Sequence, residues 1–546
     1  MKRLFLALLL TSLAYAQGTQ VWQQSTYDDF SKGTSHGVSI SSDGTLTPAS
    51  ALKTIFESPS TFIWGLAVDK DSTAYLAAGQ PARVYRVTQD GKATVVLAPA
   101  ELQVQAVVLA PDGALYAATA PDGKIYKITR NSSSPSSATT KNDSKKTSAA
   151  TTTADATKDT INISNDPNYT SSIFFDPKTK YIWALSIDKD GNLFAATGDQ
   201  GEIFKINPKG EGSVWFKSDD THIRSMLLAP DGIVYAGTDS TGLIYRITTG
   251  KDGKGEGFVL YSANKKEVTA LALNENGTLY AAAVGDKKPT NQLPGFPFPQ
   301  PASSGAPSAL TQNTPIATFS PISQATGSEV YRIPKDGAPE RLWSSKDELV
   351  YTIFVPNDSF VEIGLGNKGR ILSIGGSNSF IEINKVSALQ VTGIIGRNIL
   401  REWVITSNPG KLVESDSISS MSTSYESDVF DAHGFSKWGH LEIRGHNASI
   451  ATRSGNVENP DRNWSKWESV DLDNEGQIKS PPARFLQWSV GFVSPFVRSE
   501  APVKPLIDER PCGETCSHDY HQPDQPQQRI YLAFALPPIC CKRMHY

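Results

Sequence analysis

The segment from Gln105 to Ile128 constrains this chain more than any other feature, because its pattern returns six more times before residue 415. Each copy holds an apolar stretch, a turn with Gly, a stretch that mixes large and small residues, a second turn and a third stretch. The turns, such as Pro111–Gly113 and Pro230–Gly232, supply the positive φ that Gly adopts without steric cost. The pattern therefore predicts consecutive antiparallel strands in every copy.

The spacing of the copies is regular. Equivalent positions on the third stretch are Tyr85, Tyr126, Phe204, Tyr245, Tyr331, Leu372 and Val413. They are separated by 41, 78, 41, 86, 41 and 41 residues, and the two long gaps contain insertions. A period of about 40–45 residues with four strands per unit is typical of β-propellers. We therefore predict an all-β chain in which residues 51–414 form a seven-bladed β-propeller.

A fourth strand precedes each group of three, and the first such strand lies near Ile55. The repeat in the sequence thus begins one strand out of phase with the blade in space. We expect the strand near Ile55 to complete the blade formed by residues 391–414. Such sharing closes the ring and removes exposed sheet edges.

The strand and turn residues resemble those of bacterial secreted seven-bladed propellers of the WD40-like and YVTN-like kind. Local similarity extends to NHL, gluconolactonase-type and streptogramin-lyase-like repeats. The resemblance covers about Ala51 to Glu414 and depends on segments such as Ala114–Thr119 and Ile233–Thr238. No Trp-Asp pair ends a repeat, so the chain departs from strict WD40 sequences. The resemblance implies a fold, and one fold can carry many functions.

The first residues have the layout of a secretory signal. Lys2 and Arg3 precede an apolar run, Leu4–Leu10, and the small-residue site Ala14–Ala16. We therefore predict a cleavable signal peptide at 1–16 and a periplasmic or extracellular location. The apolar run is too short to span a bilayer, so no membrane span is expected. A net charge of −4 without a basic stripe argues against a nucleic-acid partner.

The regions outside the repeats differ in composition. Residues 17–50 are predicted to be an N-terminal extension that packs against the C-terminal domain. The insertions 131–170 and 285–326 are predicted to be disordered, because the first is rich in Ser, Thr and Lys and the second in Pro. The second insertion should lie beside the mouth of the propeller's central channel, called here the central funnel. It is expected to be either a lid or a simple loop extension.

A second, smaller domain is expected after the Ser-rich linker. Residues 425–490 alternate like the strands of a β-sandwich, with weak similarity to galactose-binding-like or discoidin-like domains. Trp464 and Trp467 share one face of a strand, where they could stack on sugars or Arg side chains, or belong to the core.

Residues 491–546 form an atypical tail that we predict to be disordered. All four cysteines lie here, and Cys512, Cys516, His518 and His521 lack a standard zinc-site spacing. The alternative interpretation of this tail is that the sandwich is cut short and followed by unrelated sequence.

Aligning the first strands places a set of aromatic, amide and charged residues around the mouth of the channel. The candidate binding residues are Trp64, Gln103, Gln105, Tyr181, Trp183, His222, Arg224, Glu267, Tyr351 and Gln390. A few polar groups in an apolar wall are typical of a binding site. The alternative is that these side chains only fill the channel.

Two functional hypotheses follow. The first is a secreted non-catalytic scaffold that binds a protein, extracellular polymer or glycan through the top face of the propeller. The second is a lyase or lactonase acting on a carbohydrate or cyclic ester, with His222 and Glu267 as base and partner. Glu267 is the single carboxylate of the set, too few ligands for a hard divalent cation. We therefore expect no metal and no cofactor, and favour the non-catalytic hypothesis.

Overall fold

The computed structural model describes residues 20–131, 163–286, 327–357, 360–376, 379–398, 401–416, 423–445, 448–474, 476–492 and 530–535. The predicted signal peptide at 1–16 lies outside these ranges.

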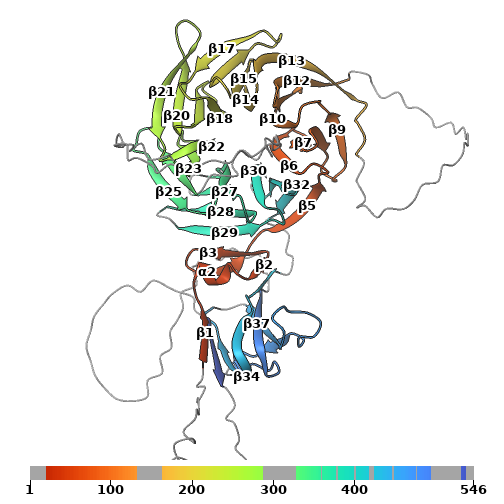
Figure 1. Ribbon diagram of the computed structural model, residues 1–546, viewed down its shortest axis with the longest axis vertical. Coiled ribbons are helices and arrows are strands. Elements are labelled where there is room, and N and C mark those ends of the chain that lie inside the picture. Colours follow the sequence, from red (N-terminus) through yellow and green to blue (C-terminus); the bar gives the residue numbers. More distant parts are fainter. Residues whose placement is uncertain are drawn as a thin grey trace, which may run out of the picture.

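The strands of residues 51–416 form seven antiparallel four-stranded blades (Figure 1). Single residue pairs also join blade 1 to blade 2, at Gly79 and Gln103, and blade 4 to blade 5, at Asp239 and Glu267. Blade 1 contains β6 (Phe62–Val68), β7 (Ala74–Gly79), β8 (Arg83–Val87) and β9 (Ala93–Leu97). Blade 2 contains β10 (Gln103–Leu109), β11 (Leu115–Ala120), β12 (Gly123–Arg130) and β13 (Tyr169–Thr179). Blade 3 contains β14 (Ile182–Ile187), β15 (Leu193–Thr197), β16 (Glu202–Ile206) and β17 (Gly212–Lys217).

The remaining blades follow the same order. Blade 4 contains β18 (His222–Leu228), β19 (Val234–Asp239), β20 (Leu243–Thr249) and β21 (Gly255–Ser262). Blade 5 contains β22 (Lys265–Leu273), β23 (Leu279–Asp286), β24 (Ser328–Ile333) and β25 (Glu340–Ser345). Blade 6 contains β26 (Val350–Phe354), β27 (Val361–Leu365), β28 (Arg370–Ile374) and β29 (Phe380–Lys385). Blade 7 contains β30 (Gln390–Asn398), β31 (Arg401–Ser407), β32 (Lys411–Asp416) and β5 (Ala51–Glu57).

Small residues in the second strands let neighbouring blades pack closely. Ala77, Ala117, Ala195, Ala236 and Ala281 are all completely buried. The first strand of each blade contacts the first strand of the next, in the order β6, β10, β14, β18, β22, β26 and β30, and β30 contacts β6. The turn glycines Gly113 and Gly232 have φ of +85° and +88°, as their positions require.

The ring is closed by a strand from the beginning of the repeat region. β5 pairs with β32, so that Thr54 lies opposite Val413 and Phe56 lies opposite Leu412. Between blade 7 and blade 1, Ile63 N donates to Ser407 Oγ over 3.0 Å. The predicted propeller with strand-shared closure is confirmed.

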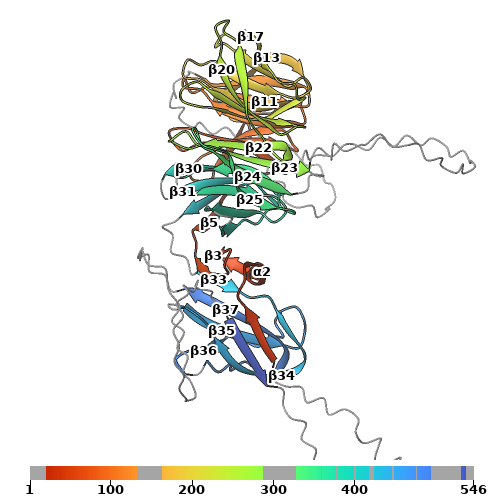
Figure 2. The same cartoon turned by 90° about the vertical axis from the view of Figure 1, so that its left-hand side faces the viewer.

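The N-terminal segment joins the propeller to a smaller domain (Figure 2). In the smaller domain lie β1 (Gln20–Gln24), α2 (Tyr27–Phe30) and β2 (Thr34–His36). Beyond them, β3 (Val38–Ser41) and β4 (Leu46–Pro48) extend blade 6, where β3 pairs with β29. The segment thus packs against the C-terminal domain, as expected, and also against the propeller.

The smaller domain is a curled antiparallel sheet around one core. Its C-terminal strands are β33 (Thr423–Glu426), β34 (Phe430–Glu442), β35 (Ala448–Gly455), β36 (Glu468–Val470), β37 (Ala483–Phe492) and β38 (Ile530–Ala535). Phe30 packs in this core with Trp438 and Leu486. The Tyr425 hydroxyl donates to the Phe30 carbonyl over 2.8 Å, and Trp488 Nε1 donates to Gln24 Oε1 over 2.7 Å.

The short helix α2 touches both domains. The Tyr27 hydroxyl contacts Glu382 and Arg370 of blade 6. Arg370 also binds Glu348 at 2.7 Å and Glu382 at 3.2 Å, and all three side chains are nearly buried. Burial, together with the charge of Glu382, raises the pKa of Tyr27 above its usual range. Tyr27 therefore remains a neutral hydrogen-bonding group at this junction.

Two expectations of disorder need correction. Residues 163–170 of the first insertion have a defined position beside β9. Val95 N donates to the Ser164 carbonyl, and Asp166 N donates to the Val95 carbonyl. In the tail, β38 pairs with both β1 and β34, so residues 530–535 are part of the small domain's sheet. Their sequence mixes β-branched, aromatic and small residues that suit a strand. The four cysteines, His518, His521 and residues 287–326 lie outside the described residues.

Among the described residues, the single α-helix is the four-residue α2, which is far shorter than a membrane-spanning helix.

We expect Phe56→Ala to destabilise the propeller by about 3–5 kcal/mol, because it removes a buried ring from the closing strand. Phe56 is 7% exposed and its ring lies 5.5 Å from that of Tyr85. Phe258 on β21 is 60% exposed, so Phe258→Ala is a matched control that should change stability by about 0.5 kcal/mol or less. Urea unfolding measures both variants, and equal effects would contradict the closure.

Candidate functional site

The candidate residues lie where the innermost strands begin, on the side of the ring called here the top face. Trp64 is on β6, Gln103 and Gln105 on β10, Trp183 on β14, His222 and Arg224 on β18, Glu267 on β22, Tyr351 on β26 and Gln390 on β30, while Tyr181 directly precedes β14. Since these strands surround one axis, the side chains converge from all seven blades.

An aromatic cluster joins blades 3 and 4. The rings of Tyr181 and Trp183 stack with centroids 4.9 Å apart and an interplanar angle of 15°. Trp183 Nε1 donates to His222 Nδ1 over 3.3 Å. The guanidinium of Arg224 lies 4.0 Å from the centroid of the Trp183 ring, which is a favourable cation–π geometry. Trp183 is therefore covered by Tyr181 and Arg224.

Gly198 makes this contact possible, and sequence analysis missed it. A Cβ at Gly198 would lie 2.4 Å from His222 Nδ1 and 2.6 Å from Trp183 Nε1. The equivalent Gly79 and Gly366 leave room for Trp64 and Tyr351 in the same way. A glycine that follows or ends the second strand, opposite an aromatic residue of the first, is the sequence signal that could have revealed this packing.

His222 is held as a neutral imidazole. Burial lowers its pKa from the usual value, and the nearby Arg224 adds to this effect, while Asp239 opposes it. Because Nδ1 accepts the Trp183 hydrogen bond, the neutral ring carries its proton on Nε2.

A salt bridge links blades 4 and 5. Arg224 Nε donates to Glu267 Oε1 over 2.5 Å, and the two side chains are 11% and 9% exposed. Glu267 thus bonds to Arg224, whereas His222 bonds to Trp183. The structure therefore does not form the direct His222–Glu267 pair that a base and its partner would need.

The candidate residues that surround the channel at the top face are called the rim. Those not yet described form two further groups of contacts. Burial, and then the charge of Glu267, raise the pKa of Tyr351 to about 12. Gln390 Nε2 donates to the Tyr351 hydroxyl over 3.0 Å, and Asn408 Nδ2 donates to Gln390 Oε1 over 3.2 Å. These bonds join blades 6 and 7.

Two buried polar atoms on blades 1 and 2 have no hydrogen-bond partner among the described residues. Trp64 stacks on Phe62 with ring centroids 5.1 Å apart and an interplanar angle of 13°. Gln103 is 5% exposed and pairs across the blade junction with Gly79. Within the described residues, Trp64 Nε1 and Gln105 Oε1 are buried without a hydrogen-bond partner. This part of the rim therefore holds one unused donor and one unused acceptor.

The prediction that Trp464 and Trp467 share one face of a strand is wrong, because both residues lie in the loop that precedes β36 (Glu468–Val470). Their environments also differ. Trp464 is 7% exposed and its Nε1 donates to the Val457 carbonyl over 3.0 Å. The Arg453 guanidinium lies 4.3 Å from a ring centroid of Trp467 and 5.8 Å from that of Trp464. Trp464 therefore packs as a core residue, and Arg453 covers Trp467.

No group of three or more His, Cys, Asp or Glu side chains that could hold a metal ion occurs within the described ranges.

Comparison with solved structures finds β-propellers. A streptogramin B lyase matches with a TM-score of 0.44 and 12% identity, over 67% of this chain and 97% of its own. A virginiamycin B lyase from Staphylococcus aureus has a TM-score of 0.43 and 10% identity, over 73% and 99%. YCF48 bound to D1 peptide has a TM-score of 0.43 and 11% identity, over 68% and 96%. No family model and no curated protein matches the sequence. Likenesses this distant say nothing about activity.

We expect Arg224→Ala to destabilise the protein by about 3–5 kcal/mol, because it leaves a nearly buried Glu267 carboxylate without its partner. The double variant Arg224→Met/Glu267→Met should recover most of this loss. Lys217→Ala, which removes a more exposed pair with Glu202, is the control and should cost about 1 kcal/mol or less. Urea unfolding of the double variant and of the single variants Arg224→Met and Glu267→Met measures the coupling, and additive losses would contradict the pairing.

Proposed function

We propose that this protein is a non-catalytic scaffold that binds a protein or extracellular polymer through the top face of its propeller. The supporting observation is that the titratable side chains Glu267 and His222 already have hydrogen-bond partners within the rim. Glu267 is bonded to Arg224, and His222 is bonded to Trp183. A binding surface keeps such groups fixed, whereas general acid–base catalysis needs them within reach of a substrate proton.

The rim offers contacts that suit a polymer segment. The stacked pairs Phe62/Trp64 and Tyr181/Trp183 supply flat apolar surface from two separate blades. Aromatic side chains of this kind are enriched in protein interfaces.

The alternative function is a lyase or lactonase at the central funnel. The observation in its favour is the lowered pKa of His222, which keeps the imidazole neutral and able to accept a proton at neutral pH. Under this alternative His222 would act as the base with no direct help from Glu267.

We also propose that the protein is secreted, on the basis of the residues that precede the propeller. Lys2, Arg3 and the apolar run Leu4–Leu10 have the order of a cleavable signal. Secretion would place the top face in contact with envelope or extracellular polymers.

We expect Phe62→Ala/Tyr181→Ala to lower capture of the partner by about tenfold or more, because apolar anchors dominate interface energies. Ile173→Ala/Phe258→Ala is the matched control, since these side chains are 55% and 60% exposed on outer strands. Full-length proteins are compared by affinity capture from an envelope extract of the source organism, with quantitative mass spectrometry.

Equal capture by both double variants would contradict binding at the top face. The enzyme alternative has a separate readout, because His222 would be its base. Turnover of a lactone or cyclic ester that disappears in His222→Ala would instead support the enzyme.

A further inference from the structure

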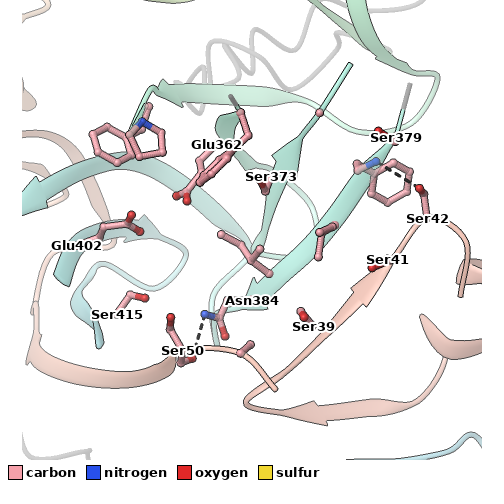
Figure 3. Close-up of a pocket in the computed structure, with 18 of the residues that line it drawn as sticks. Ser39, Ser41, Ser42, Ser50, Glu362, Ser373, Ser379, Asn384, Glu402 and Ser415 are labelled. Atoms are coloured by element: carbon pink, nitrogen blue, oxygen red, sulfur yellow. Dashed lines mark hydrogen bonds between the residues drawn. The ribbon is translucent and has the colours of Figure 1, made fainter. Parts of the chain in front are cut away.

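A cavity of about 1140 Å³ lies between blades 6 and 7, away from the top face (Figure 3). Phe354, which lines it, is the last residue of β26, whereas Tyr351 near the start of that strand belongs to the top face. The segment from Ser39 to Ser50 supplies part of its wall. The cavity is therefore formed jointly by the propeller and by the N-terminal segment that joins the two domains.

The charged residues of this cavity are all acidic. Asp43, Glu362 and Glu402 line it, and none of its described lining residues is Lys, Arg or His. The cavity thus has negative charge without a described positive partner.

Strand alternation directs two of these carboxyls toward each other. On β27, Ile363 packs toward blade 5, so Glu362 faces blade 7. On β31, Trp403 packs toward blade 1, so Glu402 faces blade 6. The carboxyl groups of Glu362 and Glu402 point toward one another in the close-up (Figure 3).

Facing carboxylates need a positive charge between them. Glu362 is 6% exposed, and its Oε2 is buried with no hydrogen-bond partner within the described residues. Burial, followed by the charge of Glu402, raises the pKa of Glu362 to about 8, and burial raises that of Glu402. At neutral pH the pair therefore holds a shared proton, which a bound cation could replace.

We propose that this cavity binds a small organic ammonium ion, with its charge against Glu362 and Glu402. Phe354, Phe360 and Phe380 line the same cavity and provide apolar and cation–π surface for such a ligand. Serine hydroxyls, including those of Ser373 and Ser415, provide further oxygen acceptors. The less buried Glu402 offers the more accessible carboxyl.

An organic cation fits this cavity better than a metal ion. Calcium takes about 6–8 oxygen ligands in a compact shell. The facing pair supplies two carboxylates, and within the described residues no group of three potential acidic, His or Cys ligands is found. The cavity volume is larger than a bare ion occupies. The aromatic side chains of its wall also suit an organic ligand better than a bare ion.

Binding should release a proton. The empty pair holds one proton between two carboxyl groups, and the one ammonium group of the ligand that reaches the pair brings one positive charge. When the ammonium binds, the shared proton passes to the buffer, so both carboxylates face the ammonium. The two groups that share this proton are Glu362 and Glu402. Asp43 is the remaining acidic residue of the lining.

The test is isothermal titration of the full chain with cadaverine at pH 7, in two buffers that differ in ionisation enthalpy. We expect saturable binding with proton release, and no binding of the neutral analogue 1,5-pentanediol. Glu362→Gln should weaken cadaverine binding by about tenfold or more, since hydrogen bonds to charged groups are the strong ones. Glu211→Gln, at an exposed site on blade 3, should leave it unchanged.

Several outcomes would overturn the proposal: no cadaverine binding, equal binding of the diol, or unchanged binding in Glu362→Gln. Binding of calcium chloride in place of cadaverine would also overturn it, in favour of a metal site. Thermal unfolding confirms that Glu362→Gln is folded, and Glu402→Gln is the second variant if it is not.

Discussion

The pairing of β5 with β32 is the interaction on which the rest of the structure depends. Thr54 and Phe56 complete a blade whose other strands come from the far end of the repeat region. Because that pairing leaves no open junction, each innermost strand contacts two neighbours around the axis. The positions of the rim side chains follow from this, since every first strand begins on the same side of the ring.

The N-terminal segment performs several structural tasks with few residues. Phe30 fills the core of the small domain, β3 extends blade 6, and Tyr27 meets the buried Arg370. The same segment then forms part of the wall of the acidic cavity. Separation of the domains would thus disturb a core, a sheet edge and a cavity together, which couples the two domains energetically.

The sequence predicted the blades because period and turn chemistry are local properties. The glycines at 113 and 232, and the regular spacing to Leu372 and Val413, were sufficient to place the strands. The pairing of side chains could not be predicted in the same way. Contacts such as Arg224 with Glu267 depend on the distance and rotation between blades, which no single repeat encodes.

The acidic cavity shows a signal that could have been used. Glu362 and Glu402 are 40 residues apart, whereas the equivalent positions Leu372 and Val413 are 41 apart. A shift of one residue turns a side chain to the opposite face of its strand, so the two carboxyls face each other across adjacent blades. The strand within the tail, in contrast, depends on a distant partner pair, β1 and β34, that the local sequence does not indicate.

The most direct test of ring closure is a disulfide between positions 57 and 411. Glu57 and Lys411 lie opposite each other in β5 and β32, and their side chains form an ion pair at 2.8 Å. After mild oxidation of Glu57→Cys/Lys411→Cys, peptide mapping by mass spectrometry should find the 57–411 link in the monomer. The control Glu57→Cys/Lys217→Cys should give no such link. Absence of the 57–411 link, or an equal yield in the control, would contradict the closed ring.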